Sequence, residues 1–170
     1  HYPLQFMCAA LQVRSREIYI KECMRLGIQV LPPCVNKSEV NYTIEGDAIR
    51  MGLGNIKHVG KAAKVIGAMF RGEADYDAAA VQESLATFEK AAGKFGDLFP
   101  EGSETGEGTE AAPAIWEDRD GFNAALQEWA DATAAAIAAA PATLEDAKAT
   151  VGPVFQTCKG CHDNYRISDE

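Results

Sequence analysis

The sequence predicts an all-α protein, an antiparallel four-helix bundle that carries a small mixed α/β appendage at its N-terminus. Apolar residues recur at steps of three and four through most of residues 46–170, which is the period of a helix with one buried face. Alanine shows a similar division, since 3 of the first 60 residues are alanine, against 26 of the remaining 110. Proline and glycine separate the periodic runs, so the helices are joined by short links. We therefore expect two parts, the appendage at residues 1–45 and the bundle at residues 46–170.

Within the appendage, the pattern predicts one helix and two short strands. The helix covers about residues 16–26 and ends at Gly27, a residue type that commonly follows the last helical turn. A strand over residues 28–31 is stopped by two prolines, and a second strand over residues 40–44 alternates apolar with polar side chains.

For the bundle, the pattern predicts four helices, over about residues 46–71, 77–99, 114–140 and from residue 143 to the C-terminal motif. Pro100 and Pro141 follow the second and third helices, because proline cannot continue a helix. Thr143 with Asp146 three residues later resembles a capping box at the start of the fourth. Pro153 lies inside the fourth helix, where we expect a kink or a local break.

The charge of the chain is acidic and unevenly spread. The net charge is −9, and residues 1–60 contain seven Lys/Arg and five Asp/Glu, whereas residues 61–170 contain nine and twenty. An acidic body of this kind argues against nucleic-acid binding by residues 61–170. The sequence contains no run of 18 apolar residues, so we expect no membrane span.

The run Cys158-Lys159-Gly160-Cys161-His162 carries the most specific chemistry in the sequence. Two thiols separated by two residues and followed at once by a histidine are the attachment signature of a c-type haem. Each thiol can form a thioether with a haem vinyl group, and the imidazole can bind the iron. About one helical turn brings these three groups together. We therefore predict one covalent haem c, held by Cys158 and Cys161, with His162 as the metal ligand.

Two other interpretations of Cys158 and Cys161 are a redox-active cysteine pair and half of a zinc site. A thioredoxin-like pair opens a helix after a strand, and no strand pattern lies near this one. A structural zinc site needs two further ligands at regular spacing, and the sequence has no second Cys-x-x-Cys and no His-x-x-x-His. Both alternatives are therefore disfavoured.

Cys8, Cys23 and Cys34 remain after the motif is assigned, and their spacing does not indicate a metal site. We expect them to be reduced thiols, mostly packed in a core. Because their number is odd, at least one would stay unpaired in an oxidising compartment.

Residues 61–170 resemble cytochrome c′. The matching residues are 61–72, 98–100, 108–111, 115–118 and 158–162, followed by Arg166. The resemblance implies a four-helix bundle with one haem near its C-terminal end, with Cys158 and Cys161 as the thioether positions and His162 as the axial ligand. It also implies four further haem-site residues, namely Thr109 and Glu110 lining the haem, Arg166 beside the imidazole, and Ile56 near the open iron face. For Ile56, packing in an ordinary core is an equally good interpretation.

The same resemblance implies a function. It implies a haem iron with five ligands. We therefore expect a non-enzymatic protein that transfers electrons or binds small gases such as NO and CO. It implies a periplasmic location after removal of a signal peptide, frequent homodimers and a redox partner of unknown identity. We expect neither nucleic acid nor a membrane as partner. Met51 and His58 are conceivable sixth ligands, although neither spacing nor a matched position marks them.

Residues 1–60 instead resemble a segment of the bacterial DNA polymerase III alpha subunit. The resemblance rests on residues 1–7, 22–33, 35–38 and 45–60. The segment lacks the metal-binding carboxylates that polymerisation requires, so it does not predict a polymerase. We interpret the chain as a chimera joined close to Gly60 and Lys61. The alternative hypotheses are a nucleic-acid-binding module with the bundle as a passenger, and a structural chimera without a selected role.

Overall fold

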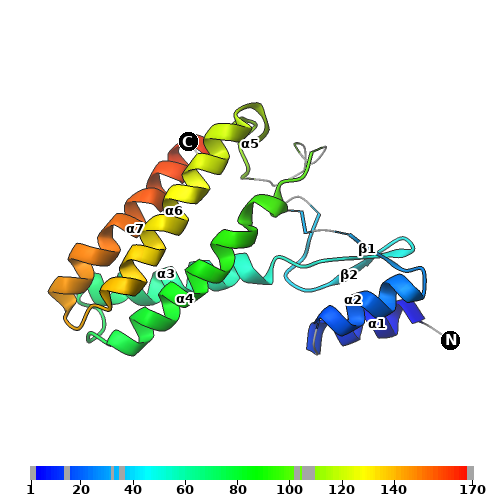
Figure 1. The fold of residues 1–170 in the computed structure, drawn as a ribbon, viewed down its shortest axis with the longest axis horizontal. Helices are drawn as coiled ribbons and strands as arrows, with labels where there is room; N and C mark the ends of the chain where they lie inside the picture. Colours follow the sequence, from blue (N-terminus) through cyan, green and yellow to red (C-terminus); the bar gives the residue numbers. More distant parts are fainter. Residues whose placement is uncertain are drawn as a thin grey trace. The chain divides into compact units, whose positions relative to one another are not determined.

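The computed structural model describes residues 3–13, 16–31, 33–34, 37–101, 104 and 110–167, without the side chains of residues 13, 16, 17, 55 and 56. The chain divides into two compact units. The N-terminal unit comprises residues 1–54 and 97–109, and the helical unit comprises residues 55–96 and 110–170. The predicted fold class is confirmed, since the chain is mostly helical with a small mixed sheet (Figure 1).

The N-terminal unit combines two helices that pack against each other with a three-stranded sheet (Figure 1). Its elements are α1 (Pro3–Val13), α2 (Arg16–Arg25), β1 (Gln29–Leu31), β2 (Thr43–Glu45) and β3 (Ala48–Arg50). The strand order is β1-β3-β2, with β1 parallel and β2 antiparallel to β3. Val30 and Ile44 both align with Ile49, which is fully buried at the centre of the sheet.

A small apolar core holds this unit together, formed by the buried residues Met7, Cys8, Leu11, Cys23, Tyr42 and Ile49. The Cys8 thiol donates a hydrogen bond to the Tyr42 carbonyl at 3.4 Å, which links α1 to the segment before β2. Cys8, Cys23 and Cys34 are all free thiols and all buried. This agrees with the expectation of packed, reduced cysteines.

The predicted helix over residues 46–71 is wrong at its start. Residues 48–50 form β3, and α3 (Gly54–Arg71) begins only after it. Gly46 has φ of 61°, a left-handed conformation that turns the chain between β2 and β3. A Cβ on Gly52 would lie 2.4 Å from the Asn41 carbonyl carbon, so only glycine permits the close approach there.

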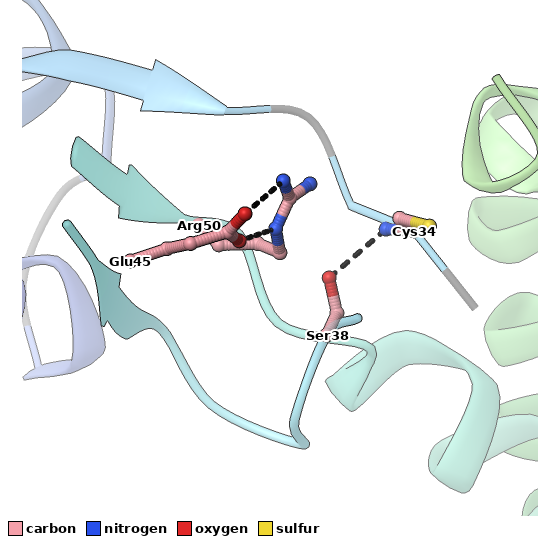
Figure 2. A network of polar contacts seen from close by, with 4 residues as sticks. All are labelled: Cys34, Ser38, Glu45 and Arg50. Atoms are coloured by element: carbon pink, nitrogen blue, oxygen red, sulfur yellow. Dashed lines mark hydrogen bonds and ion pairs between the residues drawn. The ribbon is translucent and has the colours of Figure 1, made fainter. Parts of the chain in front are cut away.

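An ion pair links the last residue of β2, Glu45, to the last residue of β3, Arg50 (Figure 2). Arg50, 8% exposed, binds both carboxylate oxygens of Glu45 through its guanidinium, with one contact at 3.1 Å. The hydrogen bond from Arg50 holds the pKa of Glu45 below its usual range. Nearby, the Cys34 backbone N–H donates to the Ser38 hydroxyl oxygen at 2.9 Å. These contacts stabilise the hairpin in place of the predicted helical start.

The helical unit contains four long helices and two short ones (Figure 1), within the part of the chain that the structure describes. They are α3, α4 (Ala78–Phe95), the 3-10 helix η1 (Gly96–Leu98), which belongs by its residues to both units, α5 (Ala114–Glu117), α6 (Arg119–Ala139) and α7 (Leu144–Tyr165). Helix α6 packs against both α4 and α7. The Asp77 side chain caps α4 by accepting from the backbone N–H groups of Ala79 and Ala80.

Aromatic side chains fill the centre of the helical unit. Phe88 of α4 is 1% exposed and lies 6.2 Å from the Trp129 ring of α6. Phe95 approaches the same tryptophan edge-on at 5.8 Å. Phe70 of α3 contacts Phe155 of α7 at 5.9 Å, and α3 also adds Ile66 to the core.

The remaining helix boundaries agree in part with the sequence pattern. The helix predicted over residues 114–140 is broken at Asp118, whose backbone leaves the helical conformation. The N-cap half of the capping box is confirmed, since the Thr143 hydroxyl oxygen accepts from the Asp146 backbone N–H at 3.1 Å. The Asp146 carboxylate accepts from the Thr143 hydroxyl at 2.8 Å. Pro153 stays inside α7, which continues through it to Tyr165. None of the described helices is both long enough and apolar enough to cross a membrane.

The buried Phe88 should dominate the stability of the helical unit. Phe88→Ala is expected to lower the free energy of unfolding by about 3–5 kcal/mol, because it removes a buried ring and leaves a cavity. The matched control is Phe6→Ala on α1, where the side chain is 67% exposed and the expected change is below about 0.5 kcal/mol. Guanidinium unfolding followed by circular dichroism measures both. Equal losses in the two variants would show that this core is not packed around Phe88.

Candidate functional site

The last turns of α7 carry the Cys-x-x-Cys-His motif. Cys158 and Cys161 are free thiols and half-buried, and Cys158 packs against the core of the helical unit. His162 follows one residue later and is exposed. The helix therefore places one thiol against the bundle interior and the imidazole at its surface.

Burial keeps both thiols of the motif in their neutral form. It raises the pKa of Cys158 to about 11, with a smaller contribution from the neighbouring Cys161. Burial likewise raises the pKa of Cys161 above its usual range. At neutral pH the folded, haem-free chain thus presents two thiols rather than thiolates.

A strand-like contact fixes the end of α7. Residues 110–112 run antiparallel to residues 165–167, with Ala111 opposite Arg166. The Ala112 N–H donates to the Tyr165 carbonyl at 3.1 Å, and the Ile167 N–H donates to the Glu110 carbonyl at 2.8 Å. The turn that follows His162 is therefore held by the segment before α5.

This contact brings together two residues that the resemblance placed in the haem site. The Arg166 guanidinium donates to the Glu110 carboxylate at 2.7 Å, across 56 residues of sequence. Both side chains are about half exposed, so the ion pair stabilises the fold by less than about 1 kcal/mol. Thr109 lies outside the described residues, and the side chain of Ile56 is not described either. Their proposed roles stay predictions.

Three further residues position the same helix end. The Tyr165 hydroxyl donates to the Asp118 carboxylate at 3.2 Å, and the Tyr165 ring meets the Phe122 ring edge-on at 5.3 Å. Gly121 leaves room for this contact, since a Cβ there would lie 2.1 Å from an Asp118 oxygen and 2.7 Å from the Tyr165 hydroxyl, and both side chains would have to move. These contacts are not predicted by any local pattern in the sequence. The nearest signal was Asp118 with Gly121 three residues later, at the start of a helix.

The residues present suit a covalently attached haem. Two thiols and an imidazole within five residues of one helix are the donor set for thioether attachment and axial ligation. Trp129, in the core against which Cys158 packs, has a buried indole N–H without an acceptor among the described residues. The same is true of the fully buried Thr133 hydroxyl one turn later. Orphaned polar atoms of this kind are expected where a bound group is absent.

The other candidate ligands are placed elsewhere. Met51 packs against the core of the N-terminal unit. His58 is exposed on α3. Among the described residues, no group of three or more His, Cys, Asp or Glu side chains could hold a metal ion. A conventional zinc site at Cys158 and Cys161 is thus not formed by this part of the chain.

Comparisons with known proteins agree with this donor set. The family model described as cytochrome c′ matches residues 47–166. The match begins before Lys61, so it includes residues that the sequence analysis compared with the polymerase. A curated cytochrome c′ from Rhodopseudomonas palustris is 42% identical over 146 residues, which cover 84% of this chain and 97% of that protein.

Solved structures show the same likeness. Cytochrome c′ from Rhodopseudomonas palustris is 39% identical with a TM-score of 0.65, covering 69% of this chain and 93% of that one. A nitric oxide complex of a mutant of cytochrome c prime from Alcaligenes xylosoxidans is 30% identical with a TM-score of 0.52, covering 68% of this chain and 95% of that one.

A second likeness concerns a much larger protein. The DNA polymerase III subunit alpha of Thermus aquaticus is 41% identical over 68 residues, which are 37% of this chain but only 6% of that protein. The likeness therefore covers only a small part of the polymerase.

The pKa of Cys158 predicts how the haem-free protein reacts. With a pKa of about 11, the thiolate fraction at pH 8 is about a hundredfold lower than for a thiol that titrates near pH 9. Iodoacetamide labelling of Cys158, followed by mass spectrometry, should speed up about tenfold per pH unit until about pH 11. The denatured chain is the control and should level off near pH 9. A plateau near pH 9 in the folded protein would contradict the burial of this thiol.

Proposed function

Because this chain belongs to the cytochrome c′ family, we propose that it is a c-type haem protein that transfers electrons or binds small gases at a five-coordinate iron. Members of the family carry one covalently attached c-type haem. The single observation that carries the proposal is the run of Cys158, Cys161 and His162 on the last turns of α7, with Cys158 packed against the core.

Three residues of α7 would hold the haem. Cys158 and Cys161 would bind the group covalently, and His162 would ligate the iron from the exposed side of the same helix. When bound, a c-type haem supplies an iron that exchanges one electron and can bind a gas at a free coordination position. The half-burial of Cys158 supports this role, because the thiol that would bind the group lies against the apolar core.

Glu110 and Arg166 would act as positioning residues. Their ion pair and the backbone contacts beside it hold the turn that follows His162. The Glu110 carboxylate also offsets the charge of Arg166, which would otherwise stand one turn from the imidazole. Groups that orient a metal-ligating histidine commonly tune its basicity. Thr109 would lie next to this pair in sequence, and Ile56 is proposed at the open face.

Relatives support the gas-binding part of the proposal. A relative with a TM-score of 0.52 has been solved as a nitric oxide complex, so NO and CO are the ligands to test first. A periplasmic location and a homodimer are proposed for this chain on its family membership. An enzymatic activity is not proposed, because the residues assigned to the motif would bind a prosthetic group and ligate its iron.

The alternative function, a nucleic-acid-binding module, is not favoured. The matched piece of the polymerase is 6% of that protein, and the chain as a whole is acidic. The origin of residues 1–60 from such a polymerase, and hence the chimera joined close to Gly60 and Lys61, stays a proposal.

The test is spectroscopic. The purified protein should show a covalent c-type haem in denaturing pyridine, and its native ferrous spectrum should change when carbon monoxide is added. His162→Ala should leave the haem attached but change its spin state, because the thioethers do not depend on the imidazole. His58→Ala on α3 is the matched control and should leave the spectrum unchanged.

Three results would contradict the proposal. A protein without covalent haem after expression with haem-attachment machinery would refute the function. A ferrous haem whose spectrum does not change when carbon monoxide is added would refute the five-coordinate site. It would point to Met51 or His58 as a sixth ligand. An unchanged spectrum in His162→Ala would remove His162 as the ligand.

A further inference from the structure

Helix α3 has a charge opposite to that of the rest of the chain. It contains Lys57, Lys61, Lys64 and Arg71 and no aspartate or glutamate. The whole chain has a net charge of −9, so subtracting the +4 of α3 leaves −13 for the remaining residues. One helix therefore concentrates positive charge on an acidic protein.

The cationic side chains of α3 lie on one face. Their spacings of four, three and seven residues are helical repeats, so they form a stripe about 20 Å long. The opposite face is apolar and includes Ala62, Ile66 and Met69, all buried in the core. Lys57, Lys61 and Lys64 are all exposed. Packing of the apolar face thus directs the cationic stripe outward.

Three of these charges have no carboxylate partner within the described part of the chain. Among the residues described, Lys57, Lys61 and Lys64 form no ion pair, whereas Arg71 pairs with Glu73 at 2.8 Å. Elsewhere on the same unit, Lys159 is paired with Asp163 one turn away, whereas the exposed Lys90, Lys94 and Lys148 form no ion pair with the described residues either. The three α3 lysines therefore differ from these three by lying together on one helix face. Like charges at these helical spacings repel each other weakly. An acidic surface placed against the stripe would relieve this repulsion.

We propose that the stripe of Lys57, Lys61 and Lys64 is a docking surface for the acidic face of a partner electron-transfer protein. The proposal rests on the proposed function, since it assigns a partner to the haem protein. Charge complementarity is the argument for this occupant, because transient redox encounters are small and are steered by opposite charge. The stripe stands on the same compact unit as the haem motif.

Other occupants suit the stripe less well. A long polyanion such as duplex DNA would also be repelled by the remaining residues, whose net charge is −13. An anionic membrane binds helices that can insert an apolar face, and the apolar face of α3 is buried in the protein core. A symmetric dimer through this face would set lysine against lysine.

Charge reversal with a matched control tests the proposal. The test variant is Lys57→Glu/Lys61→Glu/Lys64→Glu. The control is Lys90→Glu/Lys94→Glu/Lys148→Glu, which changes the net charge equally at exposed positions of α4 and α7. The probe is a reduced plant-type [2Fe–2S] ferredoxin, an acidic one-electron donor, and stopped flow measures the rate of haem reduction at several salt concentrations.

We expect the stripe variant to lose about tenfold or more in rate at low salt, and the control to change less than about threefold. The salt dependence should also weaken in the stripe variant. Haem content and carbon monoxide spectra should match the wild type in both variants, which separates docking from cofactor loss.

Two outcomes overturn the docking surface. Equal losses in the two variants would mean that only net charge matters. Stripe-dependent binding of duplex DNA, together with stripe-independent reduction by ferredoxin, would assign the stripe to nucleic acid. A wild-type protein without covalent haem would instead refute the proposed function, and the two failures are thus distinguishable.

Discussion

The site depends on the antiparallel backbone contact between residues 110–112 and residues 165–167. A helix end normally frays, because its last carbonyl groups lack partners in the helix. Here the carbonyl of Tyr165 accepts from Ala112, and the side chain of the same tyrosine reaches Asp118. The turn that bears Cys161 and His162 is consequently held from a part of the chain far away in sequence. A rigid helix end is what a covalent cofactor with an axial ligand requires.

In the helical unit, the inward faces of the helices provide the packing and the outward faces carry the charge. Aromatic residues such as Phe88 and Trp129 fill the interior and carry the packing energy. The charged residues lie outside, and α3 differs from its neighbours in carrying only cations. Stability and surface charge can therefore change independently, because the residues that serve one do not serve the other.

Much of this arrangement follows from local sequence, and the part that does not has a physical reason. The haem motif and the Thr143 cap depend on residues within one helical turn, so spacing alone predicts them. Strand β3 was missed because Ile49 fits helical and strand periods equally, and the choice depends on contacts of Gly52 with a segment that precedes it. The Glu110–Arg166 pair spans 56 residues. No local pattern can predict a contact of that separation.

The five cysteines differ in burial according to their place in the chain, and this difference affects the order in which the protein would mature. Cys8, Cys23 and Cys34 are buried in the part of the chain that is synthesised first, whereas Cys158 and Cys161 are half-buried near its end. Domains generally fold from the N-terminus as the chain emerges. The three early thiols would be enclosed before the late pair appears. Folding in this order would leave the half-buried pair as the accessible thiols for attachment and would keep the three buried thiols out of wrong crosslinks.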